Sequence, residues 1–360
     1  MSTIGILGGG QLGMMMAQAA KKLGHRIVVL DPDDQCPCIR VADEFICAKY
    51  NDEKALKDMA SMCDVMTYEF ENADAMLVEQ FADKFPQGSE ALTISSHRYK
   101  EKKFAKKLGL RTPNFFKIKS EADLYQIVSF PTLIKTCRFG YDGKGQWLIR
   151  DVEDLNEIKL EFPGEYIAED FISYDREISV VVARFVDGVV AYPPFENVHD
   201  KGILRQTTYP SSISEGVARV AVDAAIAIVK ELNYFGVLAV EMFVSEGEVI
   251  FNEFAPRPHN SAHLTIECAD FSQFDLHIAA ITHQKRIEPQ MLKSGVMFNI
   301  LGQHVAEVFS KHAAQPDEHA YIHWYGKKEN RFNRKMGHVT IAEEDKNKLN
   351  DLVLRWRMSK

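Results

Sequence analysis

The first hundred residues alternate between short apolar runs and segments with helical periodicity. The alternating segments cover residues 3–10, 12–23, 26–30, 52–62 and 64–70. Three glycines close the first run, and the apolar side chains of the second segment recur at helical spacing. This order of strands and helices predicts a parallel sheet flanked by helices, in a domain that ends near Ser95.

The pattern changes twice after this domain. A basic amphipathic helix over 97–108 leads into a small unit with strands expected over 132–136, 146–149 and 165–169. Beyond Phe171, long apolar strands predominate and surround a helix over 215–232 that has a broad apolar face. These strands are expected over 178–185, 189–192, 236–244 and 249–254. We therefore expect an α/β protein in three parts: residues 1–97, 98–170 and 171–360.

Composition and charge exclude several classes of protein. The chain has 360 residues, and its hydrophobic content of 46% is typical of a folded globular protein. The net charge of −8 argues against a general nucleic-acid binder. No apolar run approaches the ~18 residues of a membrane span. The six cysteines are scattered, without the paired spacing of a zinc site. We expect a cytoplasmic protein with reduced thiols and no membrane or nucleic-acid partner.

The glycine-rich segment Gly8–Gly13 fits the GxGxxG pattern between a strand and a helix, and Asp31 ends the next strand. Taken alone, this favours a dinucleotide-binding oxidoreductase. The physical content is weaker, because such glycines only allow a tight turn and let helix N–H groups approach an anion. A tight turn with no ligand is the other interpretation of this segment.

Acidic residues inside apolar strands give the strongest signal for chemistry. Glu241 is the single charge in the apolar run 236–244, and Glu253 lies in the run 249–254. A three-residue loop centred on Gly247 would make these runs a hairpin with Glu241 opposite Glu253. Two facing carboxylates repel unless a cation lies between them, and such oxygen ligands suit Mg²⁺ that bridges nucleotide phosphates. One exposed glutamate and one salt-bridged glutamate remain the alternative.

Three further segments suggest phosphate and substrate handling. Lys135 is the only charged residue in the apolar segment 130–136 and lies near its end. The glycine-rich loop 139–146 follows it. Segment 165–177 is compatible with an adenine-binding hinge that ends in a ribose-binding acid, although a polar linker fits equally well. Residues 255–263 gather Arg, His and Asn after Glu253, and 325–338 form a basic loop that could bind an anion or be solvated.

Together these segments resemble the ATP-grasp family, and within it the 5-(carboxyamino)imidazole ribonucleotide synthetases of purine biosynthesis. The motifs that carry the resemblance are Gly8–Gly13, 68–72, 140–146, 196–199, 252–261 and 334–338. The resemblance implies an ATP-grasp architecture with a Rossmann-like N-terminal domain, a small lid domain and a C-terminal catalytic domain. It implies ATP-dependent carboxylation of 5-aminoimidazole ribonucleotide with bicarbonate, through carboxyphosphate, by a homodimeric ligase.

The resemblance also assigns roles to residues. ATP is expected to contact Arg98, Lys135, Gly140, Tyr141, Asp142, Gly143, Lys144, Gly145, Gln146, Glu169, Asp170, Phe171, Ile172, Glu177, His199, Asn252 and Glu253. Mg²⁺, with Mn²⁺ as an alternative, is expected at Glu241 and Glu253. The ribonucleotide is expected to contact Gln11, Leu12, Glu71, Asn260, Lys327, Arg334 and Lys335. Arg257, His259 and Asp142 are expected to carry the chemistry.

Three alternatives stay open at this point. A nicotinamide-dependent oxidoreductase would use the first glycine loop but would leave the Glu241 and Glu253 pair unexplained. A non-catalytic nucleotide-binding or regulatory protein would be favoured if the phosphate or metal residues were missing, and none of them is. A related ATP-grasp ligase, such as formate-dependent glycinamide ribonucleotide transformylase, is the nearest competing function.

Overall fold

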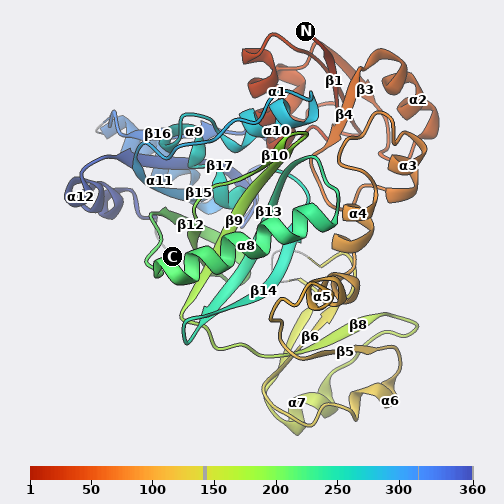
Figure 1. Cartoon of the computed structure of the whole chain (residues 1–360). Coiled ribbons are helices and arrows are strands. Elements are labelled where there is room, and N and C mark those ends of the chain that lie inside the picture. Colours follow the sequence, from red (N-terminus) through yellow and green to blue (C-terminus); the bar gives the residue numbers. More distant parts are fainter. Residues whose placement is uncertain (141–143, 315, 359–360) are drawn as a thin grey trace.

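The computed structural model describes residues 1–140, 144–314 and 316–358, and it contains three β-sheets that follow one another along the chain (Figure 1). The first domain lies at the top right of the picture, above the large central sheet (Figure 1). The small unit that follows it in sequence lies at the bottom of the picture, below the large central sheet (Figure 1). The candidate site is built where this small unit faces the central sheet.

The first sheet is parallel throughout, with strand order β3-β2-β1-β4. Its strands are β1 (Thr3–Leu7), β2 (Arg26–Asp31), β3 (Glu44–Cys47) and β4 (Val65–Tyr68). The helices of this region are α1 (Gln11–Lys22), α2 (Glu53–Met62), α3 (Ala75–Gln80) and α4 (Glu90–Ser95), with the short helix η1 (Pro37–Arg40). The predicted parallel sheet is confirmed, and β3 is a strand that the sequence pattern did not predict.

The second sheet is small and antiparallel, with order β5-β8-β6-β7. Its strands are β5 (Phe115–Ile118), β6 (Thr132–Thr136), β7 (Gln146–Ile149) and β8 (Tyr166–Asp170). The helices here are α5 (Arg98–Lys107), α6 (Glu121–Leu124) and α7 (Val152–Glu157). Helix α5 connects the first domain to this unit, and the three predicted strands are confirmed.

The third sheet is the largest, with order β14-β13-β9-β11-β12-β15-β17-β16 and β10 paired to β9. Its strands are β9 (Arg176–Phe185), β10 (Gly188–Ala191), β11 (Phe195–Asp200), β12 (Ile203–Tyr209), β13 (Gly236–Ser245), β14 (Glu248–Ala255), β15 (Ser294–Leu301), β16 (Ala320–Trp324) and β17 (Lys335–Glu343). The four predicted strands are confirmed, whereas β11, β12, β15, β16 and β17 were not predicted.

Helices cover both faces of this sheet. The helices are α8 (Glu215–Glu231), α9 (Thr265–Cys268), α10 (Gln273–Ile281), α11 (Val305–Ala314) and α12 (Lys346–Trp356), with η2 (Asn260–Ala262) and η3 (Gly302–His304). Helix α8 buries its apolar face in a core with β9, β13 and β14. Helix α10 packs on β9 and β13 from the opposite face and also on α1, so one helix joins the first domain to the large sheet.

The hairpin β13–β14 places Glu241 directly opposite Glu253, as predicted, but by a different route. Ser245 pairs with Glu248, so the turn has two residues, Glu246 and Gly247, both with positive φ. The predicted three-residue loop was therefore wrong. A β-bulge between the turn and Glu253 adds the missing residue and restores the predicted pair.

The described part of the chain contains no helix that is long and apolar enough to cross a membrane. All six cysteines are free thiols, and five of them are buried.

Candidate active site

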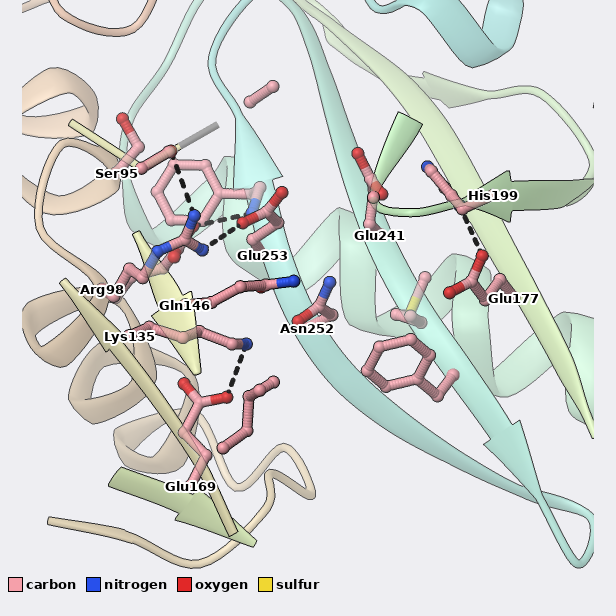
Figure 2. A pocket seen from close by; sticks show the side chains of 18 of the residues that line it. Ser95, Arg98, Lys135, Gln146, Glu169, Glu177, His199, Glu241, Asn252 and Glu253 are labelled. Atoms are coloured by element: carbon pink, nitrogen blue, oxygen red, sulfur yellow. Dashed lines mark hydrogen bonds and ion pairs between the residues drawn. The ribbon is translucent and has the colours of Figure 1, made fainter. Parts of the chain in front are cut away.

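A cavity of about 460 Å³ lies between the small antiparallel sheet and the β13–β14 hairpin (Figure 2). The predicted site residues that line it are Arg98, Lys135, Gly140, Gln146, Glu169, Asp170, Phe171, Ile172, Glu177, His199, Glu241, Asn252, Glu253, Glu71, Arg257, His259, Asn260 and Lys335. These residues come from all three sheets and their connections. The fold thus brings together most of the predicted ATP, metal and substrate residues in one place.

A buried ion pair forms the floor of the cavity on the small sheet. Lys135, on β6, donates from Nζ to Glu169 Oε2 at 2.8 Å, and both side chains are less than a tenth exposed. Burial favours the neutral acid, but the charges of Lys102 and Lys135 outweigh it and lower the pKa of Glu169 to about 2. The carboxylate is therefore ionised at neutral pH, and the lysine is held in place beside the cavity.

A second ion pair joins the connecting helix to the hairpin beside the cavity. Arg98, at the start of α5, donates from Nη1 to Glu253 Oε2 at 2.7 Å and from Nη2 to the carbonyl of Gly140 at 3.1 Å. The guanidinium therefore contacts both the glycine-rich loop and the predicted metal carboxylate. A planar group with several donors in this position suits phosphate oxygens.

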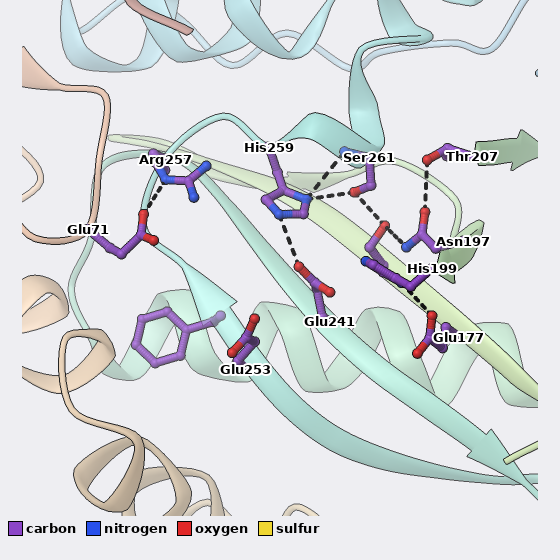
Figure 3. Close-up of polar contacts among 12 residues, drawn as sticks. Glu71, Glu177, Asn197, His199, Thr207, Glu241, Glu253, Arg257, His259 and Ser261 are labelled. Atoms are coloured by element: carbon purple, nitrogen blue, oxygen red, sulfur yellow. Dashed lines mark hydrogen bonds and ion pairs between the residues drawn. The ribbon is translucent and has the colours of Figure 1, made fainter. Parts of the chain in front are cut away.

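The partner of Glu241 is the imidazole of His259, whose Nε2 lies 3.0 Å from Oε1 (Figure 3). Burial favours the neutral acid, but the charge and hydrogen bond of His259 lower the pKa of Glu241 to about 2. The other ring nitrogen, Nδ1, lies 2.8 Å from Ser261 Oγ and 3.3 Å from the Ser261 N–H that points at it. Because Nδ1 accepts from that N–H, the ring carries a proton on Nε2, toward Glu241.

Behind His259, hydrogen bonds continue into the sheet (Figure 3). Ser179 Oγ contacts Ser261 Oγ at 2.7 Å, and Asn197 Nδ2 donates to Ser179 Oγ at 3.0 Å. Thr207 Oγ1 then donates to Asn197 Oδ1 at 2.9 Å. All four groups are buried. This chain holds Ser261, and through it the imidazole of His259, in one orientation.

The first domain contributes a carboxylate to the same cavity. Glu71 Oε2 accepts from Arg257 Nε at 2.6 Å, which ties the loop after β4 to the segment after β14 (Figure 3). Burial opposes ionisation, but the charge of Arg257 lowers the pKa of Glu71 to about 2. Close by, both amide atoms of Asn260 are buried without a hydrogen-bond partner although the residue lines the cavity. An amide left without partners in this way is suited to receive a ligand.

The cavity wall is partly aromatic. Tyr174 and Phe243 stack with ring centroids 4.6 Å apart and an interplanar angle of 12°. Next to them, His199 Nδ1 is hydrogen-bonded to Glu177 Oε2 (Figure 2). Burial opposes protonation of His199, but this hydrogen bond and nearby carboxylates raise its pKa. An aromatic surface beside an acid and an imidazole suits a nucleoside base and its ribose.

The donor set around the hairpin fits Mg²⁺. Among the described residues, no group of three or more His, Cys, Asp or Glu side chains is arranged to hold a metal ion by itself. Glu241 and Glu253 face each other across the hairpin, and each already has its own cationic or imidazole partner. Mg²⁺ is commonly held by one or two carboxylates together with substrate phosphates, which is what two opposed carboxylates can supply.

Several predicted residues lie outside this cavity. They are Gln11 and Leu12 at the start of α1, Lys144 and Gly145 in the glycine-rich loop, and Lys327 and Arg334 in the basic loop before β17. Lys327 donates to the carbonyl of Lys335 at 2.9 Å, and Arg334 donates to that of Glu329 at 3.0 Å. The predictions for Tyr141, Asp142 and Gly143 fall outside the described residues.

The first glycine loop has an anion of its own. Glu69, after β4, accepts from the N–H of Gly10 at 2.5 Å and from that of Gly13 at 2.7 Å. Asp31 accepts from the N–H of Gly9 at 2.7 Å. A side chain at Gly10 would collide with the Glu69 carboxylate, and one at Gly13 would collide with the loop's own backbone. The glycines therefore make room for a protein carboxylate where a dinucleotide phosphate would have to bind.

Some residues that build the site were missed. Lys102 lies in the predicted basic helix but is only 2% exposed, and Ser179 and Thr207 are buried hydroxyls within the strands β9 and β12. A helix wheel for 97–108 could have pointed to Lys102, because Glu101, Lys102 and Ala105 share the buried side of α5. For Ser179 and Thr207 the sequence offers only the weak signal of a hydroxyl within a strand.

Comparison with known families gives matches along most of the chain. Residues 1–95 match the ribonucleotide synthetase preATP-grasp domain, and residues 103–274 match the ATP-grasp domain. Residues 295–351 match the phosphoribosylaminoimidazole carboxylase C-terminal domain. The predicted ATP-grasp architecture with a Rossmann-like N-terminal domain is thus confirmed.

Individual relatives agree with these families. The N5-carboxyaminoimidazole ribonucleotide synthase of Staphylococcus aureus (strain COL) is 41% identical over 355 residues, which cover 96% of this chain and 94% of the relative. That of Bacillus subtilis (strain 168) is 40% identical over 364 residues, with 99% and 95% covered.

Solved structures give the same result. An ADP complex of an N5-carboxyaminoimidazole ribonucleotide synthetase superposes with a TM-score of 0.93 at 40% identity, covering 99% of this chain and 97% of the other. The Aspergillus clavatus synthase, solved with ADP and 5-aminoimidazole ribonucleotide, gives 0.89 at 27%, covering 98% and 96%. The chain belongs to the N5-carboxyaminoimidazole ribonucleotide synthase family and is an ATP-grasp ligase.

Proposed function

We propose that the chain uses ATP and bicarbonate to carboxylate the exocyclic amine of 5-aminoimidazole ribonucleotide in purine biosynthesis, giving N5-carboxyaminoimidazole ribonucleotide, ADP and phosphate. The observation that carries this proposal is a single cavity that joins cationic groups, two opposed carboxylates and an Arg–His–Asn cluster. The complex of the A. clavatus relative with ADP and 5-aminoimidazole ribonucleotide supports both substrates.

ATP is proposed to lie along the small sheet. Lys135 and Arg98 bind the phosphates together with the loop from Gly140 to Gln146, which includes Tyr141, Asp142, Gly143, Lys144 and Gly145. The strand end Glu169–Ile172 binds the adenine, and Glu177 and His199 bind the ribose. Support comes from the lining of the cavity, which contains both cations and the Tyr174–Phe243 stack.

Mg²⁺, with Mn²⁺ as an alternative, is proposed to be held by Glu241 and Glu253, with Asn252 beside them. When bound, the ion neutralises charge on the ATP phosphates during transfer. The chain's own groups would complete this neutralisation, because the Arg98 guanidinium contacts Glu253 and lines the same cavity.

The reaction is proposed to run in two steps. A bicarbonate oxygen attacks the γ-phosphorus of ATP, the bond to ADP breaks, and carboxyphosphate forms. The amine of the ribonucleotide then attacks the carboxyl carbon, or CO₂ released from it; the bond to phosphate breaks and the amine loses a proton. Arg257 and His259 would hold the bicarbonate and carboxyphosphate oxygens, and Asp142 would contact the aminoimidazole.

The ribonucleotide is proposed to bind between the first domain and the basic loop. Asn260, with its unpartnered amide, Glu71 and Lys335 line the cavity on that side. Arg40 of the first domain donates to the carbonyl of Gly326 at 3.2 Å, which places the basic loop against this domain. Such an arrangement supports the assignment of Gln11, Leu12, Lys327 and Arg334 to the same substrate.

We also propose a homodimeric, cytoplasmic enzyme with functional parts at residues 1–97, 98–170 and 171–360. Size-exclusion chromatography with light scattering tests the dimer directly: a mass near twice the 40.9 kDa of the chain is expected.

The function is tested by ADP release. With Mg²⁺ and 5-aminoimidazole ribonucleotide, we expect turnover to require bicarbonate and to be unaffected by formate. Formate-dependent turnover with glycinamide ribonucleotide would instead favour the neighbouring transformylase reaction and contradict the proposal.

A further inference from the structure

Strand β14 is an edge strand, so one side of its backbone needs partners from outside the sheet. Helix α5 supplies them through two adjacent side chains. The carboxylate of Glu101 accepts from the N–H of Phe254 at 2.7 Å. Lys102 donates from Nζ to the carbonyl of Asn252 at 2.7 Å and approaches that of Phe251 at 3.4 Å. These hydrogen bonds attach α5 to the strand on both sides of Glu253.

The segment of β14 that α5 contacts contains the β-bulge of the hairpin. Counting from the two-residue turn, a regular ladder would pair Glu241 with Asn252 and Val240 with Glu253. Instead, Met242 pairs with Phe251 and Glu241 with Glu253, so Asn252 is the additional residue. Because side chains alternate along a strand, this one-residue shift decides which face of the sheet Glu253 occupies.

The apolar side chains show what the shift avoids. Val249 and Phe251 face the core beneath α8. Without the bulge, Glu253 would follow them into that core, and Phe254 would turn toward the cavity. With the bulge, Phe254 packs in the core and Glu253 lines the cavity beside Glu241. The position of the predicted metal carboxylate therefore depends on the bulge.

Lys102 contacts this bulge without lining the cavity. The side chain is 2% exposed, is not part of the cavity lining, and has its ammonium 5.5 Å from the centre of the Phe251 ring. Its Nζ also lies 3.8 Å from Glu169 Oε1, the carboxylate that pairs with Lys135. A buried ammonium is costly unless it is hydrogen-bonded and neutralised, and the bulge carbonyls with Glu169 do both.

We propose that Lys102 is a positioning residue: its ammonium stabilises the bulge at Asn252 and thereby keeps Glu253 on the cavity face of the hairpin, opposite Glu241. This inference rests on the proposed function in one respect, the assignment of the metal to Glu241 and Glu253. It adds a residue that touches neither substrate nor metal.

The first test measures metal affinity. In the enzyme–ADP complex, the Kd of Mn²⁺ is determined by electron paramagnetic resonance for the wild type, Lys102→Met and Lys103→Met. Lys103 is the matched control, because it lies on the same helix but is exposed. We expect Lys102→Met to weaken Mn²⁺ binding ~10-fold or more, as loss of a group that orients a metal ligand commonly does. Lys103→Met should stay within about twofold of the wild type.

Kinetics separates positioning from general destabilisation. Lys102→Met should lower kcat while the KM for 5-aminoimidazole ribonucleotide stays within about twofold, because the ribonucleotide residues lie on other segments. Thermal melting confirms that the variant is folded. If Lys102→Met does not fold, the same comparison uses Lys102→Gln, whose amide N–H can still donate to a bulge carbonyl and should therefore retain a smaller defect.

A double-variant cycle is the sharpest test. Deleting Asn252 removes the bulge but leaves Glu253 opposite Glu241, because the regular two-residue hairpin then gives that register. In this background, Lys102→Met should change the Mn²⁺ Kd by less than about twofold. An equally large effect in both backgrounds would overturn the inference, since Lys102 would then act without the bulge.

The metal assignment itself is checked separately. Glu253→Gln and Glu241→Gln should each weaken Mn²⁺ binding. If they do and Lys102→Met does not, only the role of Lys102 fails. If neither glutamine variant affects Mn²⁺ binding, the proposed metal site fails, whatever Lys102 does.

Discussion

Two regions of the molecule have the sequence features of a phosphate site, and the structure treats them in opposite ways. In the loop Gly8–Gly13, the N–H groups are already occupied by Glu69 and Asp31. In the cavity beside β14, the Asn260 amide has no hydrogen-bond partner among the described residues, and Arg98 and Lys135, although paired with Glu253 and Glu169, keep further N–H donors beside a space large enough for a ligand. Glycine spacing predicts a backbone conformation, whereas binding requires donors that the protein has not satisfied itself.

The two regions also differ in how their charges are balanced. The loop is closed by short hydrogen bonds to two carboxylates, of which Asp31 is buried and Glu69 is half-buried. The cavity is balanced by ion pairs such as Arg98–Glu253, in which both groups are partly exposed. A ligand with phosphates and a metal could rearrange such pairs at little cost. At the loop it would have to displace a carboxylate that accepts two backbone N–H groups. The following predictions test this contrast.

The largest effect is expected at the hairpin. Glu253→Gln keeps the shape of the side chain but removes its charge, so we expect kcat to fall by ~10²-fold or more through lost charge neutralisation. Steady-state kinetics with saturating substrates measures this. Glu248→Gln, an exposed position on the same strand, is the control and should retain normal turnover. Full activity in Glu253→Gln would contradict the metal assignment.

The next effect tests the closed loop. Glu69→Ala leaves the N–H groups of Gly10 and Gly13 without an acceptor, so the free energy of unfolding should fall by ~2 kcal/mol or more. Urea unfolding measures this loss. Added acetate should restore part of it in the variant and leave the wild type unchanged. Glu53→Ala, at an exposed ion pair, should have little effect. Unchanged stability of Glu69→Ala would show that Glu69 does not close the loop.

A smaller effect should follow pH at the floor of the cavity. The pKa of Glu169 is about 2 in the folded protein, against ~4.3 for an unfolded chain. The stabilisation is therefore complete above pH ~4.3 and is lost as pH falls toward 2, because the unfolded state then binds the additional proton. In that window, wild-type stability should fall by up to ~1.4 kcal/mol per pH unit more steeply than that of Glu169→Gln. Parallel curves of unfolding free energy against pH would refute the pairing with Lys102 and Lys135.

The last prediction is that a ligand does not bind. NADH should not bind to the wild type, because Glu69 occupies the position of its pyrophosphate. Fluorescence titration of NADH measures this, with ADP as the positive control by calorimetry. Saturable NADH binding that ADP does not displace would reopen the dinucleotide interpretation of Gly8–Gly13.

Local patterns were sufficient for much of the fold. Strands such as β1, β9 and β13 were predictable because both of their faces are buried and they form continuous apolar runs. Strands β11 and β12 were missed because they carry polar side chains such as His199 and Thr207 toward the cavity and the hydrogen-bonded chain behind His259. Sequence periodicity reports burial, so it is weakest where a strand serves the site.

The site was predictable in part for the same reason. Single charges in apolar strands, Lys135 and Glu241, stood out against their neighbours. The bulge at Asn252 did not, because it depends on Lys102, about 150 residues earlier in the chain, and the paired register was predicted through the wrong turn. Nor could the pattern show that Glu69 fills the first loop, since that contact joins two segments that meet only in the folded domain.

The most direct test of the account is a crystal structure of the protein with Mg²⁺ and ADP. We expect the phosphates between Lys135, Arg98 and Glu253, the ion between Glu241 and Glu253, and the Gly8–Gly13 loop still closed by Glu69. Phosphates bound at the Gly8–Gly13 loop, with Glu69 displaced, would contradict the account.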